Sequence, residues 1–213
     1  MIVIFDLDGT VWNSEPGILA CMVHALDQLA LEVPTEAVLR SHIGPPLRSM
    51  LAEVGVPEPL LDDGVRHYRD RYLSAGVYEA SLYDGVIGLL DGITGDGHVL
   101  ATATSKGEVP TRTMLEHFGL ADRFAVVGAA TMDGTATTKS EVLARTLDGL
   151  DHPEPAECVL VGDRDLDVAG AAAHGIDCIG AAWGFGGRIE LVDAGAWAVA
   201  ERPVDVPALL ARR

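Results

Sequence analysis

The chain begins with the stretch that decides its fold, Met1-Ile2-Val3-Ile4-Phe5-Asp6-Leu7-Asp8-Gly9-Thr10. The first five residues are apolar and rich in Ile and Val, which predicts a short strand buried on both faces. Two carboxylates follow at the strand's carboxyl end, where open α/β sheets bind ligands. Residues i and i+2 of an extended chain point to the same side, so Asp6 and Asp8 would face one small target, one attacking while the other carries a proton. The alternative is an Asx turn at Asp8, which leaves Asp6 unexplained.

Length and composition indicate a globular protein of one large or two modest domains. Hydrophobic residues make up 48% of the 213 and charged residues 22%. No apolar run approaches the roughly 18 residues of a membrane span, and a net charge of −17 disfavours nucleic acid polymers and anionic membranes as partners. A small phosphate ester stays compatible if cations gather locally. We expect a cytoplasmic location, because no signal peptide is recognised and the three cysteines are an odd number without CxxC spacing.

The hydrophobic pattern predicts a parallel sheet interrupted by helices. Residues 14–80 read as a small helical bundle, because apolar residues recur at helical spacing between Gly and Pro breaks. Strands are then expected at 98–104, 124–127, 157–161 and 178–181, and helices at 83–92, 109–118, 140–150, 166–174 and 206–211. Strands that alternate with helices at this spacing form parallel βαβ units. The predicted fold is therefore α/β, with a Rossmann-like parallel sheet built from residues 1–13 and 81–213.

The chain has only two lysines, Lys106 and Lys139, which suggests that each is kept where its compact ammonium matters. Lys106 could contact either substrate or solvent, and the sequence leaves both open. Thr104-Ser105-Lys106-Gly107 is expected at the end of a strand and offers hydroxyl and N–H groups, although Thr-Ser is also common in loops. Lys139 is expected to start a helix after the loop 131–138. Its ammonium could neutralise both a phosphate and Asp6, which would otherwise repel each other. The alternative is an ordinary surface lysine.

A second acidic stretch follows a buried strand at Gly162-Asp163-Arg164-Asp165-Leu166-Asp167. The i, i+4 spacing of Asp163 and Asp167 would put both on one side of an opening helix. Carboxylates at a helix N-terminus are also stabilised by its dipole, which is the alternative interpretation. Several acidic residues beside another acidic pair favour a cation site, and hard oxygen ligands suit Mg²⁺. No His/Cys cluster suggests zinc.

These motifs resemble the four motifs of the haloacid dehalogenase (HAD) superfamily: Asp6-Leu7-Asp8-Gly9-Thr10-Val11, Thr104, Lys139 and Gly162-Asp163-Arg164-Asp165-Leu166-Asp167. The resemblance implies that Asp6 is a nucleophile and Asp8 a general acid and base. It implies that Mg²⁺ binds to Asp6, the backbone carbonyl of Asp8, and Asp163. Asp167 would orient the Lys139 side chain without itself binding the metal. The substrate phosphate would be held by Gly9, Thr104 and Lys139 of these motifs and by the neighbouring Ser105, which stands where the phosphoglycolate phosphatase-like branch often has Asn.

Two further segments are similar to the phosphoglycolate phosphatase-like and 5′-nucleotidase-like branch: Ser41-His42-Ile43-Gly44-Pro45-Pro46-Leu47-Arg48 and Trp183-Gly184-Phe185-Gly186. The resemblance implies that residues 14–80 form a helical cap and that Arg48 meets a substrate anion, although Arg48 could equally be a solvated helix residue. It further implies a phosphatase that forms an aspartyl phosphate. A monomer and a homodimer both stay open as the oligomeric state. A small phosphorylated metabolite such as 2-phosphoglycolate is expected as substrate, with nucleoside 5′-monophosphates next. A sugar phosphomutase and a non-enzymatic phospholigand-binding protein are the alternatives.

Overall fold

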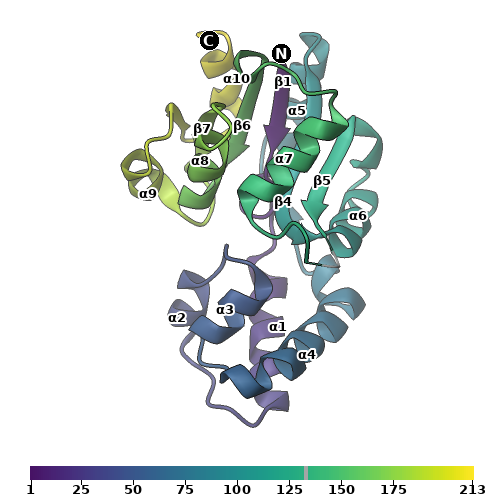
Figure 1. Ribbon diagram of the computed structural model, residues 1–213, viewed down its shortest axis with the longest axis vertical. Helices are drawn as coiled ribbons and strands as arrows, with labels where there is room; N and C mark the ends of the chain where they lie inside the picture. The colour runs from purple at the N-terminus through teal and green to yellow at the C-terminus, as the bar shows by residue number, and fades with distance from the viewer. Residues whose placement is uncertain (132–133) are drawn as a thin grey trace. The chain divides into compact units, whose positions relative to one another are not determined.

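The computed structural model describes residues 1–131 and 134–213. The chain forms two compact units, the first built from Met1–Asn13 and Leu82–Arg213 and the second from Ser14–Ser81. Figure 1 traces both units along the chain. Part of the expected loop 131–138, residues 132–133, lies outside the described residues. Within the described ranges, no helix has the length and apolar character needed to cross a membrane.

The first unit contains a six-stranded sheet in the order β5-β4-β1-β6-β7-β8. Its strands are β1 (Ile2–Phe5), β4 (Val99–Gly107), β5 (Val126–Ala130), β6 (Cys158–Gly162), β7 (Asp177–Ala181) and β8 (Ala198–Ala200). All neighbouring strands pair in parallel. The expected α/β fold with a Rossmann-like parallel sheet is therefore confirmed. Because β1 lies between β4 and β6, the carboxyl ends of these three strands meet at one edge.

The described residues of this unit form six α-helices: α5 (Val86–Gly95), α6 (Glu108–His117), α7 (Lys139–Gly149), α8 (Asp165–Ala172), α9 (Gly187–Asp193) and α10 (Val206–Leu210). In Figure 1, α7 and α8 lie side by side over one face of the sheet. Their buried residues, among them Val142 and Val168, form one apolar cluster with Ile4 and Leu160 of the central strands. Burial of such side chains at roughly 25 cal/mol per Å² is the main force that holds these helices on the sheet.

Several predicted element boundaries were wrong. The expected strand 98–104 continues to Gly107, because pairing with β5 resumes there after an irregularity between Thr104 and Gly107. Thr104 therefore does not end its strand. The strand expected at 124–127 runs instead from Val126 to Ala130. Neither α9, which begins at a glycine, nor the three-residue strand β8 was expected.

The second unit is helical, with α1 (Glu15–Gln28), α2 (Glu36–Ser41), α3 (Leu47–Glu53) and α4 (Leu61–Ser74). Helices α1 and α4 pack against each other, and the stacked rings of Tyr68 and Tyr72 are buried, with centroids 5.5 Å apart. Two short strands, β2 (Trp12–Asn13) and β3 (Ser81–Leu82), pair in a sheet of their own at the two points where the chain passes between the units.

Candidate active site

Lys139 and Asp6 form the centre of the site. Asp6 directly follows β1, where its backbone N–H donates to the Val161 carbonyl at 2.8 Å. Lys139 is the first residue of α7. Its Nζ lies 2.6 Å from Asp6 Oδ1 and 2.8 Å from Asp167 Oδ1, and donates to the Ala103 carbonyl at 2.7 Å. All three charged side chains are buried, so this lysine is not the solvated surface residue that the sequence left open.

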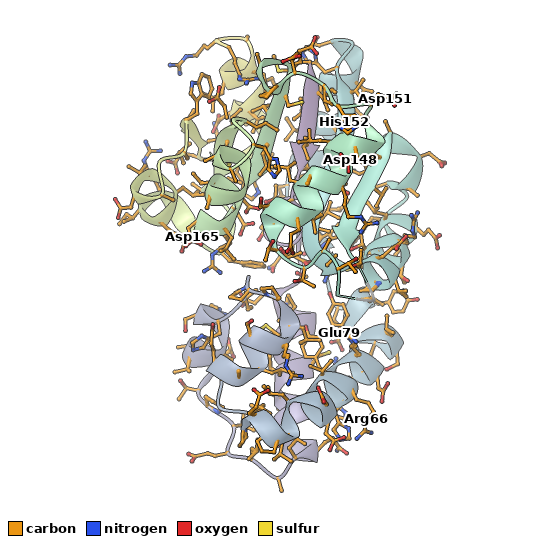
Figure 2. All side chains as sticks on the ribbon, viewed as in Figure 1. Arg66, Glu79, Asp148, Asp151, His152 and Asp165 are labelled. Atoms are coloured by element: carbon orange, nitrogen blue, oxygen red, sulfur yellow. The ribbon has the colours of Figure 1, made fainter. Side chains whose placement is uncertain are left out.

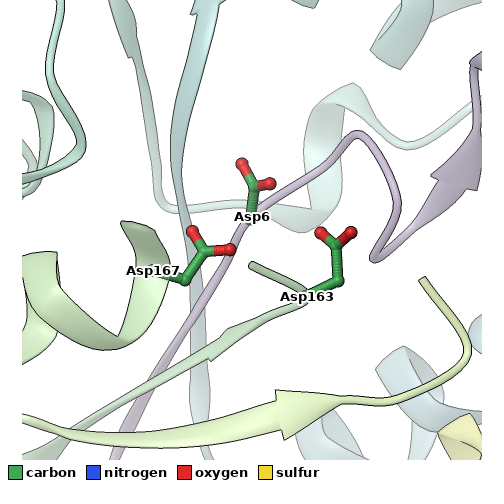
Figure 3. A group of neighbouring side chains, drawn as sticks. All are labelled: Asp6, Asp163 and Asp167. Carbon is green, nitrogen blue, oxygen red and sulfur yellow. The ribbon is translucent and has the colours of Figure 1, made fainter. Parts of the chain in front are cut away.

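The structure also brings Asp163 into this cluster. The ligand oxygens of Asp6, Asp163 and Asp167 all lie within 4.8 Å of one another. Figure 3 shows the three side chains converging from the end of β1, the bend after β6, and α8. The expectation that Asp163 and Asp167 share a helical face was wrong, because α8 begins only at Asp165. Asp163 instead precedes the helix, and the turn of the chain brings its carboxylate to Asp6.

Hydrogen bonds fix the carboxylates of Asp163 and Asp167. Asp163 is fully buried, and its Oδ1 accepts from the Thr10 hydroxyl at 3.0 Å and its Oδ2 from the Phe185 N–H at 2.8 Å. Asp167 Oδ2 accepts from the Arg164 N–H at 3.0 Å, while its other oxygen faces Lys139. By contrast, Asp165 is exposed at the surface (Figure 2) and takes no part in the cluster.

Two glycines make this close packing possible. A Cβ at Gly9, whose φ is +83°, would lie 2.2 Å from Asp163 Oδ2. A Cβ at Gly184 would lie 2.3 Å from Asp163 Cβ. Side chains at either position would therefore displace the Asp163 carboxylate. The Gly-containing loop 183–186 thus acts here as a wall of the acidic cluster.

The cluster is electrostatically incomplete by itself. Burial raises the pKa of the Asp6 carboxyl to about 6, although the Lys139 charge opposes this shift. Burial, together with the charges of Asp167 and Asp6, raises the pKa of Asp163 well above its usual range. Burial alone would lower the pKa of Lys139, but the charges of Asp167 and Asp6 outweigh it and raise that pKa. Three buried carboxylates share one buried ammonium. A divalent cation with oxygen ligands fits this excess of negative charge.

Asp8 has a separate set of partners. Its Oδ1 accepts from the indole Nε1–H of Trp12 at 2.7 Å, and its Oδ2 lies 2.9 Å from Lys106 Nζ. The sequence left the role of Lys106 undecided, and sequence reasoning missed Trp12. The signal was available in principle, because a tryptophan buried in a core usually needs a partner for its N–H. Both lysines of the chain therefore pair with the first acidic motif.

The family of the chain can be decided by comparison with known proteins. The family model of haloacid dehalogenase-like hydrolases matches residues 3–181. The chain belongs to this family.

Individual relatives from this family carry several names. Tyrosine-protein kinase PtkA of Mycobacterium tuberculosis is 42% identical over 193 residues, which cover 90% of this chain and 65% of PtkA. The chain thus spans just under two thirds of that relative. A 5′-nucleotidase of Pseudomonas aeruginosa is 37% identical (89% and 86% covered), and a phosphoglycolate phosphatase of Rhodospirillum rubrum is 31% identical (92% and 85% covered).

A solved structure supports the same family. The crystal structure of a predicted phosphatase from Clostridium acetobutylicum superimposes with a TM-score of 0.93 at 31% identity. The similarity covers 100% of this chain and 98% of that one. The HAD-like fold expected from the motifs is confirmed by this match together with the six-stranded parallel sheet.

The remaining residues expected at the site have other surroundings. Thr104 is buried in β4, where its hydroxyl accepts from the Lys106 N–H at 3.3 Å, and Ser105 follows in the same strand. Arg48 belongs to the helical unit and forms ion pairs with Glu58, at 2.8 Å, and with Asp62. Its expected contact with a substrate anion stays a prediction.

Proposed function

We propose that this HAD-family protein is a Mg²⁺-dependent phosphatase, which hydrolyses a small phosphomonoester through an aspartyl phosphate on Asp6. The observation that supports this function is the buried group of Asp6, Asp163 and Asp167 around the Lys139 ammonium. Such a group combines a nucleophile, a cation site and a fixed positive charge. Phosphoryl transfer depends mainly on positioning and charge stabilisation, which these groups supply.

The proposed reaction has two displacements at phosphorus. In the first, a carboxylate oxygen of Asp6 bonds to phosphorus, the bond to the leaving oxygen breaks, and Asp8 gives that oxygen a proton. In the second, Asp8 takes a proton from water while the water oxygen attacks phosphorus and releases Asp6. The division into two steps replaces one very slow hydrolysis, which needs up to about 10²¹-fold acceleration, by two easier reactions.

The residues that would hold the cation and the phosphate can be named. Asp6, the backbone carbonyl of Asp8, and Asp163 would bind Mg²⁺, which when bound compensates negative charge on the phosphoryl oxygens. Asp167 would keep the Lys139 ammonium in place, because its Oδ1 lies 2.8 Å from Lys139 Nζ. Lys139, Thr104, Ser105 and the backbone around Gly9 would bind the phosphoryl oxygens.

The proposed substrate is a small phosphorylated metabolite. We place 2-phosphoglycolate first and nucleoside 5′-monophosphates second, supported by relatives named for these two activities. Residues 14–80 would act as a cap that contacts the leaving group and excludes water. Arg48 would then exchange its carboxylate partners for a substrate anion.

A second candidate function is phosphoryl transfer to a tyrosine hydroxyl. It is favoured by the 42% identity with proteins named tyrosine-protein kinase PtkA. The chemistry differs in the donor and in the acceptor: ATP would replace the phosphomonoester in the first displacement, with ADP as the leaving group, and a phenol oxygen would replace water in the second. The two functions therefore share Asp6 and Lys139 and differ in the phosphoryl donor and in what reaches the aspartyl phosphate.

A phosphate-release screen with Mg²⁺, with and without chelator, tests the proposal. We expect release from 2-phosphoglycolate or a nucleoside monophosphate, its loss on chelation, and its loss in Asp6→Asn. An isomeric sugar phosphate formed from glucose 1-phosphate would indicate a phosphomutase. Transfer from labelled ATP to a tyrosine peptide, without phosphate release, would indicate the kinase. A parent protein that binds these ligands but is as inactive as Asp6→Asn would indicate a phospholigand-binding protein.

A further inference from the structure

Both oxygens of the Asp8 carboxylate are held, but by donors of very different stiffness. Oδ1 accepts from the Trp12 indole at 2.7 Å, and Oδ2 faces the Lys106 ammonium at 2.9 Å. A lysine carries its charge on a flexible four-carbon stem, so it can follow an incoming anion. An indole N–H moves only with its ring. The position of Asp8 therefore depends on how firmly Trp12 is fixed.

The ring, the carbonyl and the backbone N–H of Trp12 all have packing or hydrogen-bond partners. It is fully buried, and its ring stacks on Phe118 with centroids 5.5 Å apart and planes 27° apart. Its carbonyl accepts from the Gly9 N–H at 2.9 Å, and its own N–H donates to the Leu7 carbonyl at 3.2 Å. The turn that carries Asp8 is thus tied to the backbone of the residue whose side chain holds the Asp8 carboxylate. The Trp12 ring and the Asp8 carboxylate thus close a segment of five residues, from Asp8 to Trp12.

A purely structural role would not require this arrangement. An apolar ring of similar size would fill the same space on Phe118 without an N–H to satisfy. A carboxylate next to Lys106 already has a partner and needs no second donor to be stable. The additional indole bond restricts the direction of the carboxylate, which matters when a proton must reach one oxygen of a substrate.

We propose that Trp12 is a positioning residue for Asp8, an inference that rests on the proposed phosphatase function. The indole holds Oδ1, which leaves Oδ2 as the oxygen that faces the leaving group when Lys106 gives way. In the first displacement the proton passes from Asp8 to the leaving oxygen as its bond to phosphorus breaks. Proper orientation of Asp8 therefore matters most for substrates whose leaving group needs that proton.

Leaving-group dependence tests the role of Trp12. An alkyl phosphomonoester needs a proton on its leaving oxygen, whereas 2,4-dinitrophenyl phosphate does not. For Trp12→Phe, which keeps a ring beside Phe118 but lacks the N–H, we expect kcat/KM for the alkyl ester to fall ~10- to 100-fold. We expect it to fall by less than about 3-fold for the dinitrophenyl ester. The quantity kcat/KM is chosen because it reports substrate binding and the first displacement but not the hydrolysis of the aspartyl phosphate.

Trp183→Phe is the matched control. The Trp183 indole donates at 3.0 Å to the Thr10 carbonyl of the same turn but does not bond to Asp8. We expect this variant to affect both esters by the same factor. If Trp12→Phe fails to fold, incorporation of 3-benzothienylalanine at position 12 replaces the indole N–H by sulfur and keeps the ring shape.

The outcomes separate this inference from the proposed function. Asp8→Asn should show the same preference for the dinitrophenyl ester, only more strongly. If Asp8→Asn shows it and the position-12 variants lose both activities equally, Trp12 has a packing role and the inference is wrong. If Asp8→Asn shows no preference, or the parent protein hydrolyses neither ester, the proposed mechanism fails and the inference fails with it.

Discussion

The Lys139 ammonium lies 2.6 Å from the Asp6 carboxylate, although 133 residues separate the two in sequence. This contact joins the start of α7 to the end of β1, and Asp167 on α8 completes it from the other side. The single ammonium of Lys139 faces the three buried carboxylates of Asp6, Asp163 and Asp167, so it compensates only part of their negative charge.

Substitution of the proposed nucleophile should abolish turnover. We expect Asp6→Asn to lower kcat at least about 10⁴-fold, because an amide oxygen cannot form the aspartyl phosphate. Acid-quenched mass spectrometry should detect phosphate on Asp6 in the parent protein and none in the variant. Asp165→Asn removes a carboxylate of the same size from the exposed start of α8 and should keep parental activity. Equal losses in both variants would contradict the role of Asp6.

Removal of the buried ammonium should cost both stability and activity. Lys139→Met leaves Asp6 and Asp167 buried without their cationic partner, which is expected to lower the free energy of unfolding by about 3–5 kcal/mol. The double variant Lys139→Met/Asp167→Asn should recover part of this stability and none of the activity. Urea unfolding and phosphate release measure the two effects. A double variant as unstable as Lys139→Met would show that the ion pair with Asp167 is not the cause.

Gly9→Ala should act on Asp163 rather than only on the backbone. Both Gly9 and Gly97 have positive φ, but a Cβ at Gly9 would meet the Asp163 carboxylate, whereas one at Gly97 would meet nothing within 4 Å. Gly97→Ala should therefore cost about 1–2 kcal/mol of stability through strain alone and keep activity. Gly9→Ala should in addition lose stabilisation by Mg²⁺, followed as the shift in Tm on adding the ion. If both variants keep that shift, Gly9 does not protect the acidic cluster.

The stability of the cation-free protein should depend on pH through the acidic cluster. Burial raises the pKa of Asp6 to about 6, and the pKa of Asp163 is raised as well. These carboxyl groups therefore bind protons more readily in the folded protein than in the unfolded chain. Their buried charges lower the free energy of unfolding above about pH 6, and this destabilisation is relieved as the pH falls through that value. With chelator present, Tm should rise as the pH is lowered from about 7.5 to about 5.5. Added Mg²⁺ should raise Tm more at about pH 7.5 than at about pH 5.5.

A variant without the two charges provides the control for this pH dependence. In Asp6→Asn/Asp163→Asn, the rise in Tm on acidification should be smaller, because only the remaining acidic residues of a chain with net charge −17 contribute. Equal rises in the variant and the parent protein would assign the effect to general charge repulsion. Circular dichroism at several pH values measures both.

Arg48 should influence substrate binding more than catalysis. If it meets a substrate anion, Arg48→Ala should raise KM ~10-fold with little change in kcat. Arg66→Ala is the matched control, because Arg66 (Figure 2) lies in the same helical unit and pairs with the exposed Asp63. Unchanged KM in Arg48→Ala would leave the ion pairs with Glu58 and Asp62 as the whole function of this side chain.

The sequence predicted the central strand and the edge of the sheet because both depend on local patterns. Ile2–Phe5 is an apolar run, and the acidic residues follow directly after the strands that carry them. The start of α8 was misjudged because i, i+4 spacing is compatible with a helix whether or not one has begun. The residues alone left the contact of Lys139 with Asp6 open beside an ordinary surface position, and the resemblance to a family favoured the contact, since nothing local in either segment specifies the other.

The partners of Asp8 depended on packing that no spacing rule encodes. Trp12 reads as one more apolar residue after a turn, and its stacking on Phe118 joins segments far apart in sequence. Lys106 was recognised as unusual because lysine is scarce in this chain, but its partner followed only from the extension of β4 beyond Thr104. Interactions of this kind need three-dimensional coordinates.

The pairing of β2 with β3 has a consequence for how this protein could diversify. The chain leaves the α/β unit at β2 and returns to it at β3, and these two strands are paired. The segment Ser14–Ser81 is therefore inserted between two points of the chain that lie next to each other. That segment can be exchanged for one of different length, in evolution or by design, because the two ends to be joined stay adjacent. Such an exchange would change the inserted unit while the acidic cluster of the α/β unit stays the same.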